Sequence, residues 1–143
     1  MSLSPDAIVA LAHRHSLTVD PATLQLDESG LDFQVATAPP QGRATWLLRI
    51  PRRPDVLASA QREQAILTSV RPYLPVPVPD WQIHTDELIA YPLLPGQPAG
   101  TIDPDLQTYR WEIDAQNLPD AYLQSLGQAM ADHIVEYDGA FAV

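Results

Sequence analysis

The sequence contains no cysteine and no lysine among its 143 residues. Without cysteine the chain can form neither disulfides nor thiolate zinc sites, and it has no cysteine nucleophile. Without lysine the chain can form neither a Schiff base with a substrate nor a phosphate loop of the Walker type, whose lysine contacts the phosphates. All eight basic residues are therefore arginines.

Long apolar runs and excess positive charge are also absent. No run approaches the roughly 20 apolar residues that cross a bilayer, and the first residues show neither the basic region nor the apolar segment of a secretory signal. The net charge of −10 argues against nucleic acid as a partner, because phosphate backbones bind basic surfaces. We therefore expect a soluble, acidic, cytoplasmic protein with no membrane or nucleic-acid partner.

The charge is unevenly distributed along the chain. Residues 1–71 contain seven arginines and seven acidic residues, whereas residues 72–143 contain Arg110 and eleven acidic residues. The whole net charge thus lies in the second half of the chain. Such an asymmetry predicts two regions with different roles.

The pattern of apolar residues predicts three helices and five strands. Helices are expected over residues 5 to about 15, 55–70 and 120 to about 136, the first two capped by Ser4 and Asp55. Strands are expected over residues 23–27, 31–37, 45–50, 80–84 and 87–94. Proline-rich residues 72–79 are read as a connection, as are residues 95–119 apart from one short element near 109–113. This order predicts an α+β fold in which an antiparallel sheet carries its helices on one side.

One glutamate, Glu63, interrupts the apolar stripe of the helix predicted for residues 55–70. A carboxylate in such a stripe costs free energy unless it is paired. Its natural partner is Arg49, the only basic residue inside a predicted strand. An arginine can hold one carboxylate while it directs other N–H donors at a phosphate. The alternative is a glutamate at the edge of the stripe, with Arg49 directed to solvent.

Ser29 and Gly30 lie in the turn between the first two predicted strands. A small turn that contains glycine lets backbone N–H groups approach a phosphate closely, although an ordinary β-turn has the same signature. A glycine turn, a basic residue on the third strand and a carboxylate on the next helix together form the arrangement of a protein-kinase N-lobe.

Several ordered blocks of sequence resemble the macrolide 2′-phosphotransferases, which belong to the aminoglycoside-phosphotransferase group of kinase-like proteins. The resemblance covers about residues 5 to 133, in the blocks Asp27–Gln34, Trp46–Arg53, Glu87–Tyr91, Pro98–Asp103, Trp111–Asp114 and Ser125–Gly127. It implies a kinase-like N-lobe over residues 1–94, with a five-stranded, mostly antiparallel sheet and a packed helix. Residues 95–143 would follow the hinge as a connection and the first helix of a truncated helical C-lobe.

The resemblance also implies an activity and a set of nucleotide-binding residues. The family transfers the γ-phosphate of GTP, with Mg²⁺, to a sugar hydroxyl of a macrolide antibiotic and so confers resistance. Ser29 and Gly30 would lie in the loop that covers the phosphates. Arg49 would stand where protein kinases have a lysine, with Glu63 as its partner.

The hinge implied by the resemblance spans residues 91–94, where Tyr91 and Leu93 would meet the purine base. An apolar strand edge is the alternative interpretation of this segment.

A kinase also needs a catalytic loop and a metal-binding aspartate. The triplets at His84–Asp86 and Tyr137–Gly139 imitate these parts only loosely, since the first precedes the hinge and no catalytic loop precedes the second.

Residues 134–143 do not follow the family pattern, and the four histidines are too scattered to form a metal site. We therefore expect no catalytic residue and no metal ligand in this chain, and no measurable phosphoryl transfer by it alone. The alternative is a non-catalytic remnant or interaction module that binds a nucleotide or a partner protein.

Overall fold

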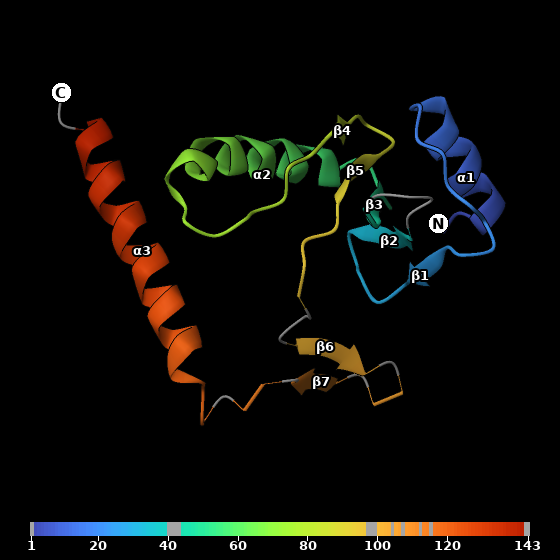
Figure 1. Ribbon diagram of the computed structural model, residues 1–143. Helices are drawn as coiled ribbons and strands as arrows, with labels where there is room; N and C mark the ends of the chain where they lie inside the picture. Colours follow the sequence, from blue (N-terminus) through green and yellow to red (C-terminus); the bar gives the residue numbers. More distant parts are fainter. Residues whose placement is uncertain are drawn as a thin grey trace. The chain divides into compact units, whose positions relative to one another are not determined.

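The computed structural model describes residues 2–39, 44–96, 100–103, 105–106, 108–111, 113–114 and 116–141 (Figure 1). The chain forms two compact units. The first comprises Met1–Ala65 and Pro79–Leu94, and the second comprises Ile66–Val78 and Pro95–Val143. The functional division expected after residue 94 stays a prediction, and residues 66–78 group with the second unit.

A five-stranded antiparallel sheet forms the centre of the first unit, as predicted. Its strands follow the order β1-β2-β3-β5-β4, and every neighbouring pair is antiparallel. Each predicted strand overlaps an observed one. The elements are α1 (Pro5–Arg14), β1 (Gln25–Asp27), β2 (Phe33–Ala38), β3 (Trp46–Pro51), α2 (Val56–Val70), β4 (Ile83–His84) and β5 (Ile89–Pro92).

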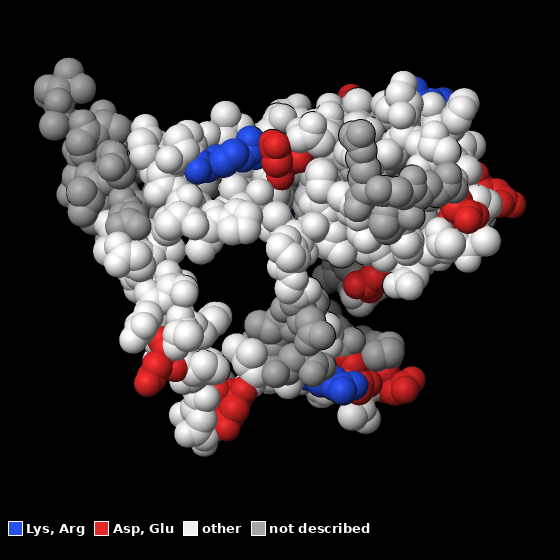
Figure 2. Space-filling model, in the orientation of Figure 1, with Lys and Arg blue, Asp and Glu red and all other residues white. Residues whose placement is uncertain are grey.

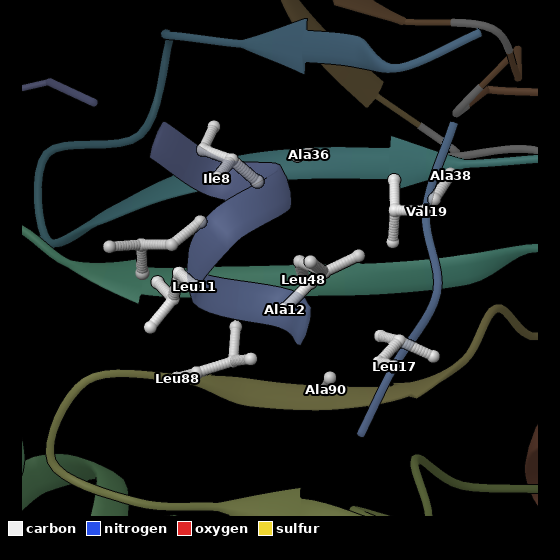
Figure 3. Close-up of a cluster of buried hydrophobic side chains, with 11 residues drawn as sticks. Ile8, Leu11, Ala12, Leu17, Val19, Ala36, Ala38, Leu48, Leu88 and Ala90 are labelled. Carbon is white, nitrogen blue, oxygen red and sulfur yellow. The ribbon is translucent and has the colours of Figure 1, made fainter. Parts of the chain in front are cut away.

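The helix α1 covers one face of this sheet. It begins where predicted, because the Ser4 hydroxyl accepts a hydrogen bond from the amide of Ala7 at 3.3 Å. Its apolar stripe packs on small and aliphatic side chains of the three central strands (Figure 3). The buried residues of this cluster are Ile8, Leu11, Ala12, Leu17, Val19, Ala36, Ala38, Leu48, Ile50, Leu88 and Ala90.

The helix α2 packs on the opposite face, so the expectation of helices on one side is wrong. Val56 and Ala60 of α2 cluster with Phe33, Ile89 and Tyr91 of the sheet. Neighbouring strand residues point to opposite faces. β5 is apolar on both faces, and β3 carries apolar residues on both faces beside Arg49. Runs of consecutive apolar residues, rather than strict alternation, are typical of strands that are covered on both sides.

The second unit contains a two-stranded hairpin and a long helix. Its elements are η1 (Arg71–Tyr73), β6 (Gly100–Asp103), β7 (Thr108–Trp111) and α3 (Asp120–Phe141), and β6 pairs antiparallel with β7. The prediction of a single short element in residues 95–119 is wrong, because two four-residue strands form there between the prolines and glycines. No helix of the described residues combines the length and the apolar character needed to cross a membrane.

Candidate nucleotide-binding site

Arg49 and Glu63 form a bidentate ion pair on the α2 face of the sheet. Arg49 lies near the middle of the sheet, where its Cα is paired with Val35 on β2 and Ile89 on β5. Its Nη1 donates to Oε1 of Glu63 at 2.7 Å, and its Nη2 donates to Oε2 at 3.0 Å. The pairing predicted from the interrupted stripe is therefore confirmed, and the alternative of an arginine directed to solvent is wrong.

Two aromatic rings enclose the guanidinium of Arg49. Its central carbon lies 4.1 Å from the centroid of the Phe33 ring and 5.5 Å from that of Trp81, distances at which a cation is attracted to a ring face. The Arg49 side chain is only 17 % exposed, while that of Glu63 is 40 % exposed. A guanidinium has five N–H donors and the ion pair uses two of them. The guanidinium is thus held in place by Glu63 and the two rings, and the ion pair leaves some of its N–H groups for other acceptors.

Tyr91, a predicted hinge residue, lies beside this ion pair. Burial raises the pKa of its phenol, an effect that the charge of Arg49 opposes and the charge of Glu63 reinforces. On β4, Nδ1 of His84 lies 2.6 Å from Oε1 of Gln64 and so links β4 to α2. His84 is therefore engaged within the fold, while the rejection of a catalytic loop at this position stays a prediction.

The predicted phosphate loop is the segment of residues 28–32, which joins β1 to β2. At its start, the amide and the hydroxyl of Ser29 both donate to Oδ1 of Asp27, at 2.9 and 2.6 Å. A Cβ on Gly30 would lie 2.7 Å from the carbonyl oxygen of Phe33. Only glycine fits there without a shift of the main chain.

Sequence reasoning missed the groups that hold this loop. Arg52 and Arg53 follow β3 directly and contact the loop, and Nη2 of Arg52 lies 2.6 Å from Oε2 of Glu28. Hydrogen bonds from Arg52 and Ser2 hold the pKa of the Glu28 carboxyl below its usual value. The sequence does contain a signal for these contacts. Two adjacent arginines follow β3, the loop before β2 contains two acidic residues, and the pairing of β2 with β3 brings the two segments together.

Leu93 lies directly after β5, and its side chain is exposed. Its amide donates to the carbonyl oxygen of Thr45 at 2.8 Å and so extends the ladder between β3 and β5. This amide is used inside the sheet. The carbonyl of Leu93 and the main chain of Leu94 are therefore the groups of this segment that we consider for contact with a base.

The structure thus brings Arg49, Glu63 and Tyr91 into one cluster. The loop that contains Ser29 and Gly30 leads into Phe33, which begins β2 and whose ring lies against the guanidinium of Arg49. Within the described residues no three histidine or carboxylate side chains lie together as metal ligands would.

The arginine side chains that the structure describes lie mostly beside charges of the opposite sign. On the face seen in Figure 2, the described arginines form separated groups, with acidic side chains beside them over α2 and near the β6–β7 hairpin. The ion pairs of the first unit follow the same pattern, since Arg14, Arg49, Arg52 and Arg53 each contact a carboxylate within 3.3 Å. Among the described residues, the face seen in Figure 2 therefore shows no broad basic patch.

Comparison with known proteins gives a consistent result at the level of families. Residues 23–139 match the Phosphotransferase enzyme family. This match extends beyond residue 133, so the expectation that the end of the chain departs from the family pattern is wrong for residues 134–139. The chain is also 44 % identical over 125 residues to the uncharacterised protein YcbJ of Bacillus subtilis (strain 168), which covers 87 % of this chain and 41 % of YcbJ.

Two solved structures show the same fold. The apoenzyme of macrolide 2′-phosphotransferase MphH from Brachybacterium faecium matches with a TM-score of 0.82 and 46 % identity, over 90 % of this chain and 42 % of that one. A type I macrolide 2′-phosphotransferase matches with a TM-score of 0.72 and 34 % identity, over 89 % and 41 %. The predicted kinase-like N-lobe is thereby confirmed. The chain spans about two fifths of the length of the relatives it matches.

Proposed function

Because this chain belongs to the phosphotransferase enzyme family, we propose that it is the nucleotide-binding part of a macrolide 2′-phosphotransferase. The proposed donor is GTP, used with Mg²⁺, and the acceptor is a sugar hydroxyl of a macrolide antibiotic, so that the reaction would confer resistance. Both solved relatives described above are named macrolide 2′-phosphotransferases. A cytoplasmic location is part of the proposal and agrees with a chain that lacks cysteine.

The ion pair between Arg49 and Glu63 is the observation that carries this proposal. Glu63 fixes the guanidinium in a single orientation through two parallel hydrogen bonds, and the remaining donors would hold nucleotide phosphates. Arginine suits this role because its planar fork binds a carboxylate and a phosphate with defined geometry. The pair would thus do what a lysine and a helix glutamate do in protein kinases.

The other predicted residues would complete a nucleotide site around this pair. The amides of the loop that contains Ser29 and Gly30 would cover the phosphates. The segment of Tyr91 and Leu93 would support the purine base, with Tyr91 buried behind it. These roles follow the order in which the elements occur in a kinase N-lobe.

In the proposed reaction the macrolide hydroxyl oxygen attacks the γ-phosphorus of GTP in line. A bond forms between that oxygen and phosphorus as the bond from phosphorus to the β,γ-bridging oxygen breaks, and GDP leaves. The hydroxyl proton passes to a base outside these 143 residues. No metal-ligand cluster is found in the described part of the chain, so we assign no step to Mg²⁺ here.

Titration of the purified chain with GTP by calorimetry tests the binding role. We expect saturable binding in the wild type and binding at least about tenfold weaker in Arg49→Met, which corresponds to about 1.4 kcal/mol. Arg62→Met is the matched control, since Arg62 is an exposed arginine on the same helix as Glu63. Absence of binding at millimolar GTP would contradict the proposal.

We further expect that the chain alone transfers no phosphate from GTP to erythromycin. The reason is that no catalytic aspartate of a kinase catalytic loop occurs in these residues. Transfer of labelled γ-phosphate to the drug by the purified chain would overturn this expectation.

A second candidate function, an interaction module, is favoured by exposed apolar side chains. Many of them lie in the second unit, whose exposed large apolar residues include Leu106, Tyr109, Trp111, Tyr122, Leu123, Leu126 and Met130. Exposed apolar groups of this kind are typical of protein contacts. The GTP titration separates the two candidates, because an interaction module without a nucleotide role would bind no GTP.

A further inference from the structure

Arg52 holds three main-chain carbonyl groups of the loop of residues 28–32. Its Nε donates to the carbonyl oxygen of Gly30 at 2.9 Å, and its Nη2 lies 3.3 Å from the carbonyl oxygen of Glu28. Its own amide donates to the carbonyl oxygen of Asp32 at 2.9 Å. One residue at the end of β3 therefore contacts both ends and the middle of the loop.

Arg53 adds a fourth carbonyl group. Its Nη1 donates to the carbonyl oxygen of Leu31 at 3.2 Å, and its Nη2 donates to Oδ1 of Asp32 at 2.6 Å. The two arginines thus bind the main-chain oxygens of residues 28, 30, 31 and 32. We call Arg52 and Arg53 together the arginine clamp.

The amide groups of the same loop are used differently. The amide of Ser29 donates to Asp27. The amides of Gly30, Leu31 and Asp32 donate to no acceptor in the part of the chain that the structure describes. Main-chain N–H groups without an internal partner bind anions or water. With its carbonyl oxygens held by the clamp, the loop is left with N–H donors to offer a ligand.

The clamp also compensates charges that would repel an anion. Glu28 and Asp32 each contact an arginine at 2.6 Å. The Glu28 carboxylate accepts further hydrogen bonds from the hydroxyl of Ser2 at 2.9 Å and from Nε2 of Gln34 at 2.8 Å. Without Arg52, a carboxylate would stand unneutralised next to the amides that we expect to meet phosphates.

We propose that Arg52 and Arg53 are positioning residues, which hold the loop of residues 28–32 so that its free amides bind the phosphates of the nucleotide. This inference rests on the proposed function, which supplies the phosphates. It extends that function by assigning the affinity for phosphate to the arginine clamp as well as to Arg49.

The test measures how much the phosphates of the nucleotide add to its binding. Dissociation constants for guanosine and for GTP are determined with the full chain, and their ratio is the phosphate preference. A loss of folding would weaken both ligands alike, whereas a misplaced loop weakens GTP alone. We expect Arg52→Gln to lower the preference about tenfold, a change of about 1.4 kcal/mol.

Three further variants sharpen the test. Arg52→Lys keeps the charge but cannot hold two carbonyl groups and a carboxylate with one fork, so we expect it to lose most of the preference as well. Arg53→Gln, at a more exposed side chain, should lower the preference in the same direction and serves if Arg52 variants do not fold. Arg14→Gln removes an exposed arginine that pairs with Glu87 on another part of the unit and should leave the preference unchanged.

The outcomes separate the clamp from the proposed function. A wild-type chain that binds GTP no more tightly than guanosine would overturn the function assigned to the loop. A wild-type preference that survives in the Arg52 and Arg53 variants would overturn the clamp and leave the proposed function standing. A preference kept by Arg52→Lys and lost in Arg52→Gln would show that charge alone acts, which contradicts the positioning role.

Discussion

Arg49 and Glu63 are joined by two nearly parallel hydrogen bonds of 2.7 and 3.0 Å, which connect the centre of β3 to the middle of α2. The guanidinium is enclosed by the rings of Phe33 and Trp81 and is mostly shielded from water. A charge in such a place needs its partner, because an unpaired, largely buried guanidinium retains a desolvation cost. The relationship therefore links the stability of the first unit to its proposed function.

The first prediction concerns the stability supplied by this pair. Glu63→Gln leaves Arg49 without a charged acceptor, so we expect the free energy of unfolding to fall by about 1–3 kcal/mol. Chemical denaturation followed by circular dichroism measures it. Glu87→Gln is the control, because it breaks an exposed pair with Arg14 that should contribute less than about 1 kcal/mol. Equal effects of the two variants would contradict the account of the Arg49 pair.

The second prediction concerns the main chain at Gly30. Gly30→Ala places a methyl group 2.7 Å from the carbonyl oxygen of Phe33, so we expect the free energy of unfolding to fall by about 1–3 kcal/mol. Gly127→Ala is the matched control, since its Cβ meets no atom within 4 Å on the helix α3. This control should be neutral or stabilising by up to about 1 kcal/mol. A Gly30→Ala variant as stable as the wild type would show that the loop is looser than described.

The third prediction concerns the ionisation of Glu28. Hydrogen bonds from Arg52 and Ser2 lower the pKa of this carboxyl from 4.5, so the ionised form is favoured in the folded chain. Its contribution to stability is present above pH 4.5 and is lost as the pH falls through the lower, folded pKa. Carboxyl-carbon NMR titration measures this pKa.

Arg52→Gln should return the pKa of Glu28 toward its ordinary value in the same titration. Asp114 is the internal control, because the side chain of Asn117 and the amide of Gln116 lower its pKa without any arginine. An unchanged Glu28 in the variant would contradict the assigned cause.

The fourth prediction concerns Gln34, a polar side chain that is only 1 % exposed. Its Oε1 accepts from the amide of Leu3 at 2.7 Å, and its Nε2 donates to the carbonyl oxygen of Leu3 at 2.9 Å. Gln34→Met removes both of these bonds and the one from Nε2 to the Glu28 carboxylate, and it should lower the free energy of unfolding by about 1–3 kcal/mol. It should also speed hydrogen exchange at the Leu3 amide. Gln61→Met, at an exposed position of α2, should change neither quantity.

The parts of the fold that sequence could predict are those with a local periodic signal. The run of apolar and β-favouring residues over 45–50 located β3, and a single glutamate inside an apolar stripe located the ion pair. In both cases the physical cause is the burial of apolar side chains, which is visible as a local pattern in the sequence. The spacing of these elements alone did not define a kinase lobe. The resemblance to the macrolide phosphotransferases identified them as a kinase-like N-lobe.

The parts that sequence missed depend on contacts between distant residues. The hairpin of β6 and β7 was not predicted, because the prolines and glycines around it are typical of a connection. Gln34 occupies a strand position where a polar residue ordinarily faces water, and its burial is made favourable by hydrogen bonds to the main chain of Leu3 and to the Glu28 carboxylate. The contacts of Arg52 and Arg53 with the loop join residues more than 20 positions apart. No periodic pattern in the sequence predicts such contacts.

The most direct test of the central claim is an amide NMR titration of the chain with GTP. The account predicts that the amide signals of Gly30 and Leu94, and the side-chain N–H signal of Arg49, shift with one common dissociation constant. It predicts that these shifts weaken together in Glu63→Gln, because the guanidinium then lacks its fixed orientation. Millimolar GTP that leaves all three signals in place, or that shifts only signals of the second unit, would contradict the account.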